Sequence, residues 1–177
     1  MVNWFINTII KMEVKFKKLK EGAIIPSKAT DGSAAYDLYA PEDILITKGR
    51  FVIPLGFAME MPKGIQALID PRSGFSAKGM EGYRYLKYLF GGEEEDTIFV
   101  SDRTYRFDCD VIEGKIDSDY RGEVGAIVYN NDGAFLLKKG TRLAQMTFQK
   151  VESVEWNEVE ELSESDRKGG FGSTGVK

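Results

Sequence analysis

Short runs in which apolar and polar residues alternate recur along most of this chain. The strictest lies at 105–111, where Tyr105, Phe107, Cys109 and Val111 share one side of an extended backbone. Similar β-rich runs begin at Val14 and recur at 44–47, 50–53, 57–61, 65–69, 124–129, 135–137 and 143–151. Glycine, proline and lysine separate them at intervals of roughly ten residues. This spacing predicts an all-β sandwich or barrel.

Composition limits the size and class of the protein. A chain of 177 residues with a hydrophobic fraction of 42% suits one ordinary domain with a real core. Its 19 glycines favour a turn-rich fold over a helical bundle. The net charge of −4 gives no general attraction to nucleic acid or to an anionic membrane, so neither is expected as a partner.

Two absences exclude several kinds of chemistry. Without histidine the chain has no Ser-His-Asp triad, no Cys-His pair and no HExxH zinc site. With Cys109 as its one cysteine it forms no intrachain disulfide, which suits a reducing compartment, and we expect a cytoplasmic protein. Acid–base work falls to carboxylates, lysine or tyrosine. Any metal is a hard cation held by oxygen, with Mg²⁺ the first choice.

The two ends differ in character from the middle. Residues 1–11 are interpreted as an N-terminal extension, and Met12 as an alternative start. The apolar run at 4–10 lacks the basic region and cleavage pattern of a signal peptide. No apolar stretch reaches the ~18 residues that span a bilayer. Residues 163–177 are polar and then glycine-rich, which predicts a mobile arm.

Five segments do not look like ordinary strands or turns. The first, 32–40, contains Asp37, which either serves a functional site or pairs with an arginine. The second, 71–78, runs from Arg72-Ser73-Gly74 into a short helix that Ser73 is predicted to cap. Helix N–H groups beside an arginine favour an anion site, and the alternative is a capped turn with a surface arginine.

The third segment, 114–125, sets glycines around two carboxylates, a tyrosine and an arginine. A polar hairpin explains the glycines but not the apolar Ile116 next to Asp117. The fourth segment is 138–148. The fifth, 166–175, holds four glycines, Phe171 and a Ser-Thr pair. Glycines let backbone amides approach phosphates and an aromatic ring can stack on a base, although such a tail can also be merely flexible.

Taken in order, the five segments resemble the five motifs of the trimeric dUTP pyrophosphatases (dUTPases), through YDLYA, PRSG, GKIDSDYRGE, GTRLAQ and GGFGSTG. The resemblance covers residues 12–175 apart from an insert at roughly 80–108. It implies a jelly-roll-like β-barrel domain over 12–162, a C-terminal arm over 163–177 and a homotrimer with shared active sites. It also implies hydrolysis of dUTP to dUMP and pyrophosphate with Mg²⁺.

Roles follow from the resemblance residue by residue. Asp117 matches the aspartate that activates the attacking water, and Tyr120 the tyrosine under the deoxyribose. The hairpin 111–117 resembles the one that reads uracil. The substrate-binding set implied by the resemblance is Arg72, Ser73, Gly74, Val111, Lys115, Ile116, Asp117, Tyr120, Gln145, Arg167, Phe171, Gly172, Ser173 and Thr174. Mg²⁺ is expected on the phosphates and waters without a direct protein ligand, and Asp37 is at most an outer-shell partner.

The sequence departs from the family pattern at three places. Ala35 stands where a glycine is common, and the arm is one residue shorter between Arg167 and Phe171, where Lys168 can substitute. The third departure is the insert, in which two apolar arms around 91–96 predict an extra hairpin beside the active-site rim.

Two alternatives use other features of the chain. A dCTP deaminase, or a bifunctional enzyme, would use Glu123. A regulatory binding protein would use the insert to contact a protein partner, although the insert also suits packing within its own trimer.

Overall fold

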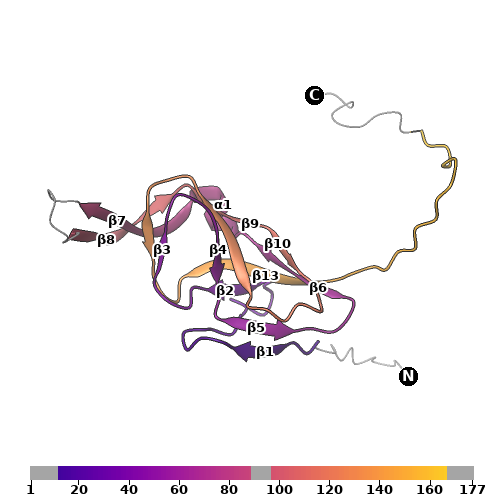
Figure 1. Cartoon of the computed structure of the whole chain (residues 1–177), viewed down its shortest axis with the longest axis horizontal. Helices are drawn as coiled ribbons and strands as arrows, with labels where there is room; N and C mark the ends of the chain where they lie inside the picture. Colours follow the sequence, from indigo (N-terminus) through magenta and orange to yellow (C-terminus); the bar gives the residue numbers. More distant parts are fainter. Residues whose placement is uncertain (1–11, 89–96, 167–177) are drawn as a thin grey trace, which may run out of the picture.

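The computed structural model describes residues 12–88 and 97–166 (Figure 1). Thirteen strands and one short helix occupy this part of the chain. The elements are β1 (Lys15–Lys18), β2 (Tyr36–Tyr39), β3 (Ile44–Ile46), β4 (Gly49–Pro54), β5 (Phe57–Glu60), β6 (Ile65–Asp70), α1 (Ser73–Lys78), β7 (Met80–Tyr88), β8 (Thr97–Phe107), β9 (Cys109–Ile112), β10 (Gly114–Ile116), β11 (Gly125–Asn130), β12 (Phe135–Leu137) and β13 (Arg142–Lys150). The all-β fold class is therefore confirmed.

The strands form four antiparallel sheets that wrap around one core. Their strand orders are β1-β5, β10-β6-β13-β2, β4-β11-β9 and β3-β12-β7-β8. Neighbours in a sheet are often far apart in sequence, as in the pairing of β13 with both β2 and β6. Distant motifs are therefore brought to one sheet.

Strand alternation explains the core. In β11, Ala126 and Val128 point inward and are fully buried, whereas Tyr129 points to the other side and is exposed. Phe107 and Phe135 stack inside with ring centroids 4.2 Å apart. Each fully buried large apolar side chain contributes about 1.5–3 kcal/mol, so this core provides the main stabilisation.

One local prediction is wrong, and one predicted run is divided between two strands. Helix α1 begins after Arg72, whose side chain and that of Ser73 form no capping hydrogen bond, so the prediction that Ser73 caps the helix is wrong. The run at 105–111 keeps its predicted alternation, with Phe107, Cys109 and Val111 buried, but it is divided at Asp108 between β8 and β9. The Asp108 N–H donates to Asp132 Oδ2 at 2.7 Å, and this contact marks where the chain passes from one sheet to another.

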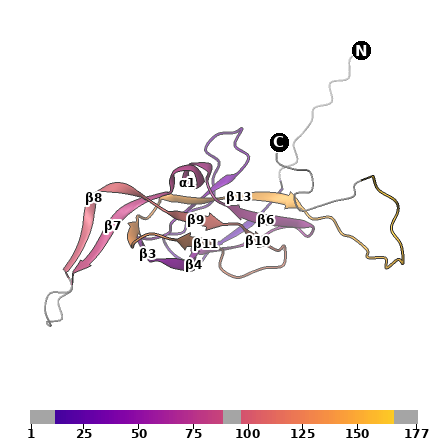
Figure 2. The ribbon, with the colours of Figure 1, turned by 90° about the horizontal axis from the view of Figure 1, so that it is seen from above.

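The insert forms the predicted hairpin. Strands β7 and β8 pair from Met80–Phe107 outward to Tyr88–Thr97 and project from the body (Figures 1 and 2). The ladder shifts register between Tyr83 and Tyr85, where the Ser101 hydroxyl accepts the Arg84 N–H at 2.9 Å. Beyond β13 the chain has no regular secondary structure through residue 166, and it leaves the body on the opposite side (Figure 2).

Candidate active site

A hollow of about 260 Å³ lies beside the turn that follows β10. It is lined by Val52, Lys115, Ile116, Asp117, Tyr120, Glu123, Val124, Gly125 and Ile127. Asp117 and Tyr120 are both exposed at its surface. A carboxylate that reaches solvent beside a partly apolar hollow can activate a water molecule next to a bound ligand.

The turn itself is closed by local hydrogen bonds. The Tyr120 N–H donates to the Asp117 carbonyl at 3.1 Å, and the Tyr120 hydroxyl donates to the Glu123 carbonyl at 3.0 Å. A Cβ at position 122 would overlap the Tyr120 hydroxyl, so a larger residue there would displace the tyrosine ring. The turn therefore holds the tyrosine ring folded back over Gly122 and Glu123, at the hollow that Asp117 also lines.

Strands β9 and β10 lead into this turn, but they lie in different sheets and pair with β11 and β6, so the hairpin expected at 111–117 does not form as a paired ladder. Val111 is buried in the core and pairs with Val128, so a ligand can meet its backbone but not its side chain. Lys115 and Ile116 line the hollow directly, and Ile116 pairs with Ala67 of β6. Of these three predicted residues, two line the hollow and Val111 lies in the core.

A second group of predicted residues gathers at the other end of β6. The Asp37 carboxylate, with a side chain 13% exposed, lies 3.4 Å from Arg72 Nε and 3.2 Å from Arg142 Nη1. Arg72 also donates from Nη1 to the Arg142 carbonyl at 3.1 Å. One carboxylate therefore orients two guanidinium groups, which are the side chains best suited to bind phosphate.

Gln145 and the start of α1 belong to this second group. Gln145 Nε2 donates to the Pro71 carbonyl at 3.0 Å, which ties β13 to the turn before the helix. The first helical bonds run from Phe75 and Ser76 to the Arg72 carbonyl, so the amides of Ser73 and Gly74 precede them at the helix start. Amides in this position suit an anion.

The two groups do not meet within one chain. Asp117 follows Ile116, which pairs with Ala67 near the beginning of β6, whereas Arg72 follows the end of β6. Arg72 lies five positions beyond Ala67 along the chain, on the order of 16 Å at ~3.3 Å per residue. One chain thus holds the carboxylate group and the arginine group apart, at two places on its surface.

The described residues fit Mg²⁺ without a direct protein ligand. Within residues 12–88 and 97–166, no three His, Cys, Asp or Glu side chains cluster as metal ligands. The oxygens of Asp37 face guanidinium groups. These donors fit a Mg²⁺ that enters with a polyphosphate and keeps its waters, a common arrangement for this ion.

Five predicted residues lie outside the described part of the chain: Arg167, Phe171, Gly172, Ser173 and Thr174. Other site residues were missed by the sequence reasoning. Arg142 lies in the fourth motif and was not singled out there. Val52 and Ile127 reach the hollow through the β4–β11 pairing, which no local pattern reveals. A larger hollow of about 630 Å³ is lined by 20–22, 41–43 and 139, and none of the predicted residues lies there.

Comparison with known proteins identifies the family. The dUTPase family model matches residues 21–85 and 106–175, on either side of the hairpin tip. A deoxyuridine 5'-triphosphate nucleotidohydrolase of Hydrogenobaculum sp. is 36% identical over 170 residues, covering 94% of this chain and 100% of its own. One from Nautilia profundicola is 38% identical over 167 residues, covering 93% and 99%. The chain belongs to the dUTPase family and is a dUTP diphosphatase.

Solved structures show the same fold. The Staphylococcus bacteriophage 80alpha dUTPase with dUPNHPP superposes with a TM-score of 0.72 at 24% identity, covering 93% of this chain and 99% of that one. A mutant dUTPase from phage phi11 of S. aureus, solved to show coordination of a structural Mg(II) ion, gives a TM-score of 0.66 at 20% identity, covering 86% and 99%. Among the described residues no helix has the length and apolarity needed to cross a membrane.

Proposed function

We propose that this enzyme converts dUTP to dUMP and pyrophosphate by an in-line attack of water on the α-phosphorus, with Asp117 as the general base. The observation that carries the proposal is the exposed Asp117 carboxylate beside Tyr120 at the hollow. A carboxylate base suits a chain without histidine.

The reaction balances without a covalent intermediate. The water oxygen bonds to the α-phosphorus as the bond to the bridging oxygen of the β-phosphate breaks. Asp117 accepts the proton that the water loses and returns it to solvent, and pyrophosphate leaves. Charge spreads over the phosphate oxygens, so positioning and electrostatics account for most of the acceleration.

Selectivity is assigned to the turn at 117–124 and to the segment 111–117. The Tyr120 ring lies under the deoxyribose and leaves no space for a 2′-hydroxyl. Backbone groups of 111–117 pair with uracil, among them Val111, while Lys115 and Ile116 line the hollow. Cytosine presents a donor where uracil presents an acceptor, so the wrong base leaves buried polar groups unpaired.

The phosphates are assigned to the second group. Arg72, the amides of Ser73 and Gly74, and Gln145 bind the triphosphate, with Asp37 holding the arginine in place. Mg²⁺ supplies further positive charge to the phosphate oxygens. Support for triphosphate binding comes from the 80alpha dUTPase solved with dUPNHPP.

The separation of the two groups supports a site shared between subunits. We assign a homotrimer in which the Asp117 group of one subunit meets the Arg72 group of another. The arm of a further subunit adds Arg167, Gly172, Ser173 and Thr174 at the γ-phosphate and Phe171 on the uracil ring. The buried Cys109 thiol suits a reducing cytoplasm.

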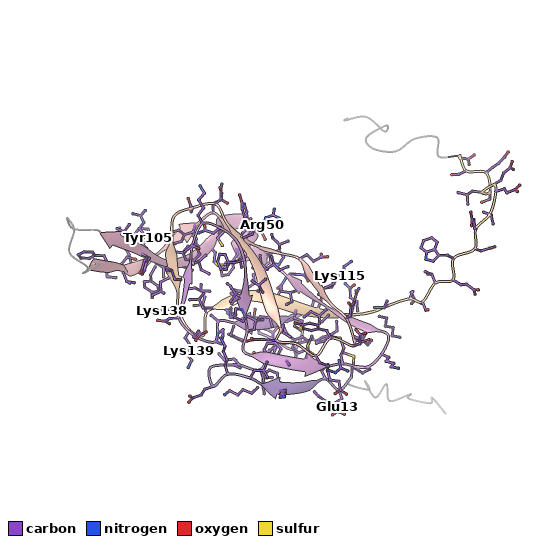
Figure 3. All side chains as sticks on the ribbon, viewed as in Figure 1. Glu13, Arg50, Tyr105, Lys115, Lys138 and Lys139 are labelled. Atoms are coloured by element: carbon purple, nitrogen blue, oxygen red, sulfur yellow. The ribbon has the colours of Figure 1, made fainter. Side chains whose placement is uncertain are left out.

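The insert is assigned to packing within the trimer rather than to a foreign protein. Its exposed apolar residues, Leu86, Phe99 and Val100, support contact with another surface. Figure 3 places Tyr105, at the base of the hairpin, and Lys115, beside Asp117, on opposite sides of one chain. Strand β7 begins directly after α1, so the base of the hairpin is close in the chain to the Arg72 group.

Release of pyrophosphate from dUTP, dCTP and UTP tests the proposal, with ammonia measured in parallel. We expect pyrophosphate release from dUTP to exceed by far the slow release from UTP and dCTP, and we expect no ammonia. Ammonia from dCTP would indicate the deaminase that uses Glu123, and no turnover would indicate the regulatory protein. The family match favours neither of these alternatives.

A further inference from the structure

Glu123 links the substrate hollow to Gly56, which lies in the turn between β4 and β5. Its Oε1 accepts the backbone N–H of Gly56 at 2.9 Å, across 67 residues of sequence. Its backbone carbonyl accepts the hydroxyl proton of Tyr120 at 3.0 Å. The same residue therefore contacts a fixed point of the fold with its side chain and the sugar-binding ring with its backbone.

Gly56 is a firm anchor because its surroundings leave it little freedom. It has a φ of 77°, and a Cβ on it would lie 3.1 Å from the Ala23 Cβ. Its carbonyl accepts the N–H groups of Leu19 at 2.8 Å and Lys20 at 3.0 Å. Both backbone polar groups of Gly56, its N–H and its carbonyl, are thus hydrogen-bonded.

The neighbouring residue strengthens this docking. The Val124 carbonyl accepts the Leu55 N–H at 2.9 Å, and the Val124 N–H donates to the Phe57 carbonyl at 2.8 Å. Val124 is 1% exposed. The end of the 117–124 turn is therefore fastened around Gly56, whereas Asp117 and Tyr120 at its start are exposed at the hollow.

We propose that Glu123 is a positioning residue, which fixes the Tyr120 ring and thereby sets the preference for deoxyribose over ribose. The inference rests on the role given above to Tyr120. Glu123 acts here as a hydrogen-bond acceptor, so its negative charge is not required. An amide oxygen in the same place accepts the Gly56 N–H equally well.

Variants of Glu123 separate these properties. Glu123→Gln keeps the acceptor and should retain the wild-type ratio of kcat/KM for dUTP over UTP. Glu123→Ala leaves the Gly56 N–H without this acceptor and frees the turn, so we expect the ratio to fall about tenfold, the order of effect of losing one hydrogen bond. The change should appear mainly as a higher KM for dUTP, because Asp117 is retained.

A matched control removes a similar anchor away from the hollow. Asp43 Oδ1 accepts the Lys139 N–H at 2.8 Å, and Asp43 lines no part of the Tyr120 hollow. Asp43→Ala should lower the melting temperature while leaving the dUTP-to-UTP ratio unchanged. Tyr120→Phe keeps the ring but removes its bond to Glu123, so it tests the same link if Glu123→Ala does not fold, and its ratio should also fall.

The outcomes are distinct. Equal wild-type turnover of dUTP and UTP, or none, would contradict the proposed function itself. If the wild type prefers dUTP but Glu123→Ala has the same dUTP-to-UTP ratio, the positioning role is overturned. Where Glu123→Ala does not fold, an unchanged ratio in Tyr120→Phe overturns it. Damage in Glu123→Gln equal to that in Glu123→Ala would also overturn it, because the charge would then be the required property.

Discussion

Asp37 and Arg72 form an ion pair at 3.4 Å although their strands are not neighbours in the sheet. Strand β13 lies between β2 and β6, and its Arg142 approaches the same carboxylate at 3.2 Å. The first, second and fourth motifs therefore meet at one partly buried carboxylate. Removing its charge would leave two guanidinium groups close together without a counterion.

Asp37→Asn should weaken substrate binding. The amide cannot balance Arg72 and Arg142, so Arg72 leaves its position at the triphosphate, and we expect KM for dUTP to rise about ten- to hundredfold. Steady-state kinetics measure the change. Glu60→Gln, which breaks the exposed pair with Lys15 at 2.8 Å, is the control and should leave KM unaltered. A normal KM in Asp37→Asn would remove the carboxylate from the phosphate site.

Asp117→Asn should keep the fold and nucleotide binding but lose most turnover. The amide cannot accept the proton of water, and the loss of a general base costs on the order of 10²–10⁴-fold in kcat. Pyrophosphate release and binding of a non-hydrolysable dUTP analogue measure the two properties. Asp119→Asn alters an exposed carboxylate on the same turn and should be nearly silent. Comparable turnover in the two variants would exclude Asp117 as the base.

Truncation after Ser165 should leave a folded protein with severely reduced turnover of dUTP. The arm from 166 onward carries the residues assigned to the γ-phosphate and to the uracil ring, and closure over the site excludes water from the phosphates. Circular dichroism, size-exclusion chromatography and kinetics compare the truncated and full chains. Phe171→Ala in the full chain isolates the ring. Near-normal turnover after truncation would refute the role of the arm.

Shortening the insert tests what the hairpin contacts. Tyr83 and Thr104 are opposite each other in the ladder, so residues 84–103 can be replaced by Asn-Gly, a two-residue turn that joins such a pair. We expect a folded barrel whose trimer dissociates at higher protein concentration than that of the wild type. Sedimentation and turnover measure this.

A milder variant of the insert keeps the hairpin. Changing Leu86 and Val100, which are 49% and 43% exposed, to serine should weaken the trimer in the same direction. A trimer and turnover unaffected by both changes would favour a foreign protein partner at this surface.

Cys109 should make the protein less stable in alkali. Burial, with smaller effects from Asp110, Asp108 and Asp132, raises the pKa of its thiol from 9.0 to about 12. As pH rises, the unfolded chain therefore loses this proton before the folded one does. The contribution of the thiol to the free energy of unfolding is fully present below about pH 9 and is lost as pH rises toward 12. Urea midpoints of the wild type and Cys109→Ala, compared at neutral pH and at about pH 10.5, test this. A constant difference between the two proteins would contradict it.

Much of the β architecture was predictable because side-chain alternation is local. The runs at 44–47, 50–53, 57–61 and 65–69 correspond to β3, β4, β5 and β6 with boundaries that differ by at most one residue. The two arms of the insert were likewise recognised as a hairpin, which needs only neighbouring segments and a polar turn. The break at Asp108 was not predictable, because it depends on contacts with Asn131 and Asp132 from a distant turn.

The sequence by itself determined the chemistry available to this protein: no imidazole, carboxylates as the candidate bases, and five motifs in a fixed order. Only the tertiary structure decided how those residues are grouped. Pairing of β6 with β10 and β13 puts Asp117 and Arg72 at opposite ends of one strand, and pairing of β4 with β11 brings Val52 to the hollow. The physical reason is that long-range strand pairing fixes distances that alternation and spacing along the chain do not contain.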